Sequence, residues 1–189
     1  RGSNALAPPS ADCGVCDSDA MDDRVRRDAL GNDLDLAEFA TWRATQPDVD
    51  NSGLVFAAND NATKTCSVWW AGTETDLLDR MRAEARARGI TLHVHRAPYS
   101  MQEIQRAGHL IFGNRERLEQ LGFDLQAIAG PNTDFLGLTV QGAVLGDEQA
   151  EQLPADLVAS VRGELAGLLQ DTHVRLDDVR IEYGRVVLL

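Results

Sequence analysis

The sequence predicts an α+β fold: a mixed β-sheet with helices packed mainly on one face and a βαβ core at residues 66–96. Two short apolar runs flank the turn-forming residues 59–61, an amphipathic stretch follows them, and the next run alternates apolar and polar residues. A strand–helix–strand unit places its two strands side by side and parallel through a right-handed crossover. The preceding hairpin then makes the sheet mixed.

Length and composition allow one domain or two small lobes. The chain has 189 residues, of which 43% are hydrophobic, and a chain of this size buries roughly 70% of its unfolded surface. Residues 1–18 contain Pro8, Pro9 and Gly14 without periodicity, which indicates a flexible arm. We expect a single α+β domain over 19–189, with two lobes at 19–145 and 146–189 as the alternative.

The first helical region is expected to be interrupted. From Asp19 to Arg43 the spacing of apolar residues suits one broken helix or two short ones. Gly31 and Asn32 mark the break, and the Asp33 carboxylate can cap the second piece.

The predicted hairpin joins strands 53–58 and 66–71. The next helix runs from Glu74 to Arg88, and Gly89 suits its C-terminal stop. Thr73 and Asp76 resemble a capping box. The predicted buried stripe of this helix consists of Leu77, Leu78, Met81 and Ala85.

A half-buried strand is predicted over 90–96, because apolar and polar residues alternate there until Pro98. Ser100 and Glu103 then form a capping box for another helix. Further on, we expect a strand over 135–145, a helix with Pro154 at its first position, and alternating residues over 172–183. We detect no convincing internal repeat.

The charge balance excludes some partners. Thirty Asp and Glu residues against 18 Lys and Arg residues give a net charge of −12, and both nucleic acid and anionic membranes require clustered positive charge. No run approaches the length of a membrane span, so we expect no direct membrane insertion of this segment. The Ala, Pro and Ser residues near the start are typical of a linker behind an export signal or anchor, which favours a secreted or membrane-anchored protein with this segment outside the cytoplasm.

The order of the motifs resembles a known family. The runs GLVFAANDNATKTCSVWWAG and GITLHVHRAPYS, each followed by a helix, are similar to the pro-region-like domain of actinobacterial secreted proteins. The pro-regions of the α-lytic protease and streptogrisin serine peptidases are related. The resemblance covers about residues 34–144, and its most specific part is Arg96 to Ser100. It implies a folding assistant and inhibitor of a peptidase, acting in trans or adapted to another use, since no peptidase follows Leu189 in this sequence.

Three cysteines favour a structural disulfide. Cys13 and Cys16 form a CxxC pattern, but no strand precedes it, as redox motifs require. A zinc site would need a second pair of ligands, and Cys66 is the remaining cysteine. We expect Cys66 to bridge to one of the arm cysteines, with a local Cys13–Cys16 bridge as the alternative.

No catalytic set or cofactor motif emerges. Ser100 lies outside any GxSxG motif and is expected to serve as a helix cap. The glycines lack the spacing of phosphate-binding loops, so we expect no cofactor. His93 and His95 lie on one strand face about 7 Å apart and are weak metal-ligand candidates, with the solvent face of a strand as the simpler interpretation.

The sequence therefore favours a non-enzymatic, extracytoplasmic protein-binding domain, with a serine peptidase as the partner that the resemblance implies. The alternatives are a metal-binding protein or enzyme that uses His93 and His95, and a structural ectodomain. An exposed tryptophan beside Tyr99 could anchor a partner, and the apolar end of the chain could enter a partner's cleft or close a hairpin. The partner-binding candidates are Trp70, Tyr99, Val187 and Leu189.

Overall fold

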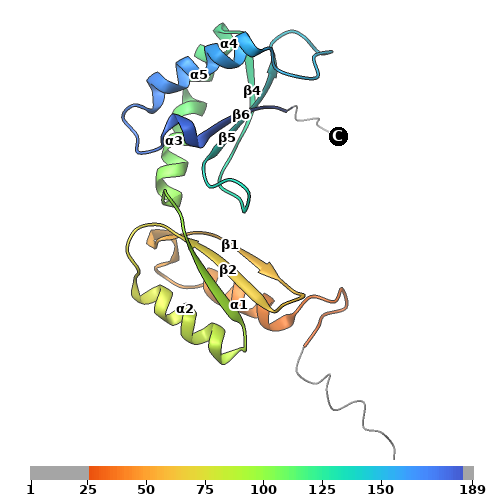
Figure 1. Ribbon diagram of the computed structural model, residues 1–189, viewed down its shortest axis with the longest axis vertical. Coiled ribbons are helices and arrows are strands. Elements are labelled where there is room, and N and C mark those ends of the chain that lie inside the picture. The colour runs from red at the N-terminus through yellow and green to blue at the C-terminus, as the bar shows by residue number, and fades with distance from the viewer. Residues whose placement is uncertain (1–25, 185–189) are drawn as a thin grey trace, which may run out of the picture.

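The computed structural model describes residues 26–184, which form two lobes joined end to end (Figure 1). Each lobe contains one three-stranded mixed sheet. The first lobe contains α1 (Leu34–Ala44), the 3-10 turn η2 (Val49–Asn51), β1 (Leu54–Asp60), β2 (Thr65–Trp70), α2 (Asp76–Ala87) and β3 (Thr91–Arg96). The second contains α3 (Met101–Gly113), α4 (Arg115–Gln120), β4 (Phe123–Ala129), β5 (Leu138–Val144), α5 (Ala155–Leu169), η3 (Leu176–Asp178) and β6 (Val179–Tyr183).

The two lobes share one topology. In the first sheet, ordered β1-β2-β3, β1 is antiparallel to β2 and β2 is parallel to β3. In the second sheet, ordered β4-β5-β6, β4 is antiparallel to β5 and β5 is parallel to β6. Helix α5 connects β5 to β6, as α2 connects β2 to β3 in the first lobe. The predicted α+β class and the βαβ core are thus confirmed. The fold, however, has two sheets instead of one, and it repeats an arrangement that no sequence repeat reveals.

Helices cover one face of the first sheet. Trp70 is 0% exposed, and its indole N–H donates a 3.0 Å hydrogen bond to the carbonyl of Thr73. Cys66 and Val68 point to the same side as Trp70. They pack against α1 and the predicted stripe of α2, whose buried residues are Leu77, Leu78, Met81 and Ala85.

The helix caps are partly as predicted. The Asp33 carboxylate accepts hydrogen bonds from the first-turn N–H groups of α1, and Gly31, with φ of 82°, makes the turn before it. The capping box expected for α2 is wrong, because the helix begins after Thr75, which makes no side-chain cap. Pro154 precedes the first turn of α5 as its N-cap rather than occupying its first position.

The second lobe packs α3 and α5 against its sheet (Figure 1). The predicted capping box of α3 is confirmed: the Ser100 hydroxyl accepts from the Glu103 N–H at 3.2 Å, and the Glu103 carboxylate accepts from the Ser100 N–H at 2.7 Å. The buried core of this lobe includes Ile104, Ala107, Ile111, Leu118, Phe123, Leu138, Val140, Val161, Leu165 and Val179.

A short connection joins the lobes between Arg96 and Met101. Tyr99 within it belongs to the core of the second lobe. The Gln102 side chain donates a 3.0 Å hydrogen bond to Asn51 Oδ1 across the two lobes. The lobes thus divide at this connection. The alternative with lobes at 19–145 and 146–189 would separate β5 from β6, which are paired.

Candidate functional site

The cysteine prediction has no support in the described residues. Cys66 is a free thiol, fully buried between the first sheet and its helices. Its Sγ lies 3.5 Å from Arg43 Nη1. Burial raises the pKa of this thiol, and the Arg43 guanidinium opposes that rise. Cys13 and Cys16 lie outside the described residues.

Two predicted partner-binding residues do not face solvent. Trp70 is 0% exposed and Tyr99 is 6% exposed, because both side chains belong to hydrophobic cores. This corrects their assignment as exposed anchors. Val187 and Leu189 lie outside the described residues.

Next to Trp70, Trp69 is half-buried and lies on the open face of the first sheet. Its ring stacks on Phe56, with centroids 4.2 Å apart, and on His95, with centroids 4.8 Å apart. The three residues are neighbours across β1, β2 and β3. Their rings therefore stand in a row across the sheet, each covering a face of the next.

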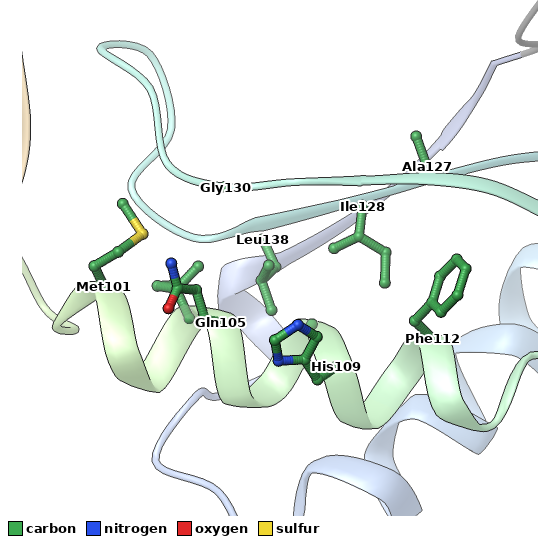
Figure 2. A pocket seen from close by; sticks show the side chains of 10 residues that line it. Met101, Gln105, His109, Phe112, Ala127, Ile128, Gly130 and Leu138 are labelled. Carbon is green, nitrogen blue, oxygen red and sulfur yellow. The ribbon is translucent and has the colours of Figure 1, made fainter.

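The main apolar opening is a groove of about 520 Å³ between α3 and β4 (Figure 2). From α3 it is lined by a stripe at helical spacing: Met101, Gln105, His109 and Phe112, hereafter the α3 stripe. Figure 2 shows Gln105, His109 and Phe112 projecting toward β4, with Ile128 pointing down between the last two. The remaining lining residues are Ile104, Gly108, Ala127, Gly130 and Leu138.

The groove arises because α3 carries apolar residues, Met101 and Phe112, outside its core-facing side, where they are interspersed with the polar Gln105 and His109. Ile104, Ala107 and Ile111 face the core, whereas Phe112 on the other face remains 51% exposed. At Gly108 the helix lies close to β4, since a Cβ there would meet Ile128 Cγ2 at 3.6 Å, an ordinary van der Waals contact. The lining residues include no Asp, Glu, Lys or Arg, so the groove favours an uncharged, apolar occupant.

One wall of the groove is a sheet edge. β4 is the first strand of its sheet and pairs only with β5 among the described residues. An edge strand presents backbone N–H and C=O groups that another strand can pair with. The groove thus combines backbone hydrogen-bonding groups with apolar side-chain positions.

A second cavity, of about 350 Å³, begins where the first ends. It shares Met101 and Gln105 with the α3–β4 groove and continues along β1, the edge strand of the first lobe, from Leu54 to Ala57. Arg43 and Asp50 also line it, so this part carries charge that the α3–β4 groove lacks.

A third cavity, of about 700 Å³, is polar and lies at the carboxyl ends of the parallel strands β2 and β3. Glu103 and Arg106 line it. Hydrogen bonds from the N–H of Ser100 and then from the His173 ring lower the pKa of the Glu103 carboxyl, so Glu103 is an anion engaged in capping α3.

The described residues contain no metal-binding cluster, and Ser100 has no histidine as its hydrogen-bond partner. Ser100 caps α3, and its hydroxyl contacts Glu103 instead of a histidine. No group of three or more His, Cys, Asp or Glu side chains between residues 26 and 184 could hold a metal ion. Within the same residues, every helix is too short or too polar to span a bilayer.

Sequence reasoning identified α3 but not the groove beside it. The α3 stripe has the helical spacing that a sequence shows, yet its partner strand β4 was not predicted. The sequence pattern of β4 is weak, because a register irregularity between Leu125 and Ala127 interrupts the alternation of buried and exposed residues.

Comparison of the chain with protein-family models, with characterised proteins and with solved structures gives no match in any of the three.

Proposed function

We propose that this chain is a non-enzymatic protein-binding domain that holds an extended apolar segment of a partner protein between α3 and β4. The observation that carries the proposal is the position of a largely apolar groove beside β4, the first strand of the second sheet. In this mode of recognition, backbone pairing with the edge supplies affinity and side-chain pockets supply specificity.

The dimensions suit a short strand. Met101 and Phe112 are eleven positions apart in α3, which corresponds to about 16 Å of helix. A strand of about five residues has that length, so two or three of its side chains would point into the groove. Large aliphatic side chains suit the lining, because Met101, Ile128 and Phe112 offer only apolar contacts there.

The resemblance to secreted pro-regions supports an extracytoplasmic setting and suggests a streptogrisin-like serine peptidase as the first partner to test. Two alternatives stay predictions: a structural ectodomain, and a metal-binding protein or enzyme that uses His93 and His95. For the second, the described residues offer no group of three or more His, Cys, Asp or Glu side chains that could hold a metal ion.

A peptide-binding experiment tests the proposal. The probe is a fluorescein-labelled nine-residue peptide that alternates Val and Thr, and the readout is fluorescence anisotropy. A matched peptide with N-methylated backbone at alternate residues cannot donate those hydrogen bonds. We expect binding of the first peptide and at least about tenfold weaker binding of the second, the equivalent of about 1.4 kcal/mol.

Two protein variants locate the binding. Phe112→Asp places a charge in the groove, whereas Leu121→Asp places one on another exposed apolar residue, 40% exposed, outside it. We expect the first to abolish peptide binding and inhibition of a streptogrisin-like peptidase, and the second to leave both unchanged. Equal loss in the two variants, or no binding of peptide or peptidase at micromolar concentration, would overturn the proposal.

A further inference from the structure

We infer that His93 and His95 form a two-imidazole chelating site for Cu²⁺ on the open face of the first sheet. The two residues occupy successive same-face positions of β3, and both are exposed. Their ring centroids lie 6.4 Å apart, with the rings tilted by 45°. This site is separate from the α3–β4 groove, to which neither histidine contributes.

The separation of the rings is suitable for a shared metal ion. Imidazole nitrogens bind metal ions such as zinc at about 2.0–2.1 Å. One ion bonded to a nitrogen of each ring accounts for most of the 6.4 Å between the centroids, and a small rotation of the exposed His93 ring supplies the rest.

The sheet orders one ligand and leaves room around the other. His95 stacks on Trp69 with 25° between the ring planes, and Trp69 stacks in turn on Phe56. A ring that is already held loses less side-chain entropy when it binds. His93 lies opposite the small Ser67, so space remains above it for the ion and its water ligands.

The donor set selects the metal. Imidazole suits Zn²⁺, Cu²⁺ and Ni²⁺, and the affinity of such sites is greatest for Cu²⁺. No third protein ligand is present within residues 26–184, so water completes the coordination. The net charge of −12 attracts cations to the surface generally, and the two imidazoles provide the ligands that bind the ion at one place.

Trp69 provides the readout, because a Cu²⁺ ion bound to His95 lies beside its indole. Tag-free protein is titrated with CuCl₂ while tryptophan fluorescence is recorded, and calorimetry measures the same binding directly. We expect saturable quenching that EDTA reverses. His93→Ala and His95→Ala should each weaken binding by about tenfold or more, since even the loss of an outer-shell partner costs that much.

Matched variants separate this site from other ligands in the chain. His109→Ala and His173→Ala, both in the second lobe, should bind Cu²⁺ as the unaltered protein does, and so should a Cys13→Ser/Cys16→Ser double variant. Trp69→Phe should lose most of the quenching and keep the calorimetric binding.

Two results would overturn the inference: retention of binding in a His93→Ala/His95→Ala double variant, or its loss in the cysteine variant. Melting temperatures without metal establish that each variant is folded. Phe112→Asp should bind Cu²⁺ normally, so failure of the peptide proposal and failure of the metal site are distinguishable.

Discussion

The hydroxyl of Tyr99 donates a 2.5 Å hydrogen bond to Asp178 Oδ2, 79 positions further along the chain. The same hydroxyl accepts a 3.1 Å hydrogen bond from the backbone N–H of Arg175. Because Tyr99 lies in the connection between the lobes, this pair fixes the end of the first lobe to the segment that leads into β6.

Tyr99→Phe should destabilise the second lobe. The substitution keeps the buried ring but removes the donor to a carboxylate, a kind of hydrogen bond worth about 1.5–3 kcal/mol. Tyr183→Phe is the matched control, since its hydroxyl donates to a neutral carbonyl, that of Ala150. Urea unfolding should show the larger loss for Tyr99→Phe, and equal losses would contradict a special role for Asp178.

The same pair predicts a pH dependence. The hydrogen bond from Tyr99, and then that from Arg175, lower the pKa of Asp178 below its ordinary value of 3.8. The unfolded chain therefore binds a proton at higher pH than the folded one, so this stability is complete above about pH 4 and is lost as the pH falls through the lower, folded pKa.

In Asp178→Asn the melting temperature should accordingly fall less steeply than in the parent protein as the pH drops below about 4. The neighbouring Asp177, 88% exposed, gives the control, because Asp177→Asn should leave the slope unchanged. If both variants follow the parent curve, Asp178 contributes nothing to acid sensitivity.

Some features of the fold follow from local sequence alone. The caps at Asp33 and Ser100 and the stripe of α2 were predicted, because hydrogen bonds and contacts within one or two turns determine them. Neighbouring residues of a strand point to opposite faces, so one of Trp69 and Trp70 must face the helices. Alternation cannot tell which face of a strand meets the helices, and for this reason Trp70 was wrongly taken as a surface residue.

The second sheet and the groove depend on distant contacts. In β4, Phe123 and Leu125 are buried at alternate positions, but the next residue that faces α3 is Ile128, because an irregularity shifts the register. A pattern of period two therefore ends too soon to reveal the strand. The groove is lined by residues of α3 together with Ala127, Ile128 and Leu138 of the second sheet, so nothing within α3 alone marks its exposed side as a site.

Gly142 in β5 should not tolerate a methyl group. A Cβ there would lie 2.3 Å from a carbon of the Phe123 ring and 2.6 Å from the carbonyl oxygen of Asp124. Gly142→Ala should therefore lower stability by about 1–3 kcal/mol through overpacking. Gly163→Ala in α5 should raise stability by about 0.5–1 kcal/mol, since no neighbouring atom lies within 4 Å of its Cβ position and alanine favours helix. Melting temperatures that move in the same direction would contradict this difference.

Two adjacent residues of α3 should differ sharply in their effect on stability. Ile111 is fully buried in the second core, whereas Phe112 is 51% exposed at the groove. Ile111→Ala should cost about 2–5 kcal/mol, and Phe112→Ala only about 0.5 kcal/mol. Chemical denaturation measures both. A large loss for Phe112→Ala would mean that its ring supports the fold and is not available to a partner.

Cys66 should react only when the first lobe unfolds. Its side chain is fully buried, and burial raises the pKa of the thiol above its ordinary value of 9.0, so both access and thiolate content are low in the folded protein. Iodoacetamide without reductant should leave Cys66 unmodified in buffer and alkylate it in urea, as peptide mass spectrometry would show. If Cys66 stays unmodified in urea and reacts only after reduction, it is bridged to an arm cysteine. That result would support the predicted disulfide and, with it, the expected location outside the cytoplasm.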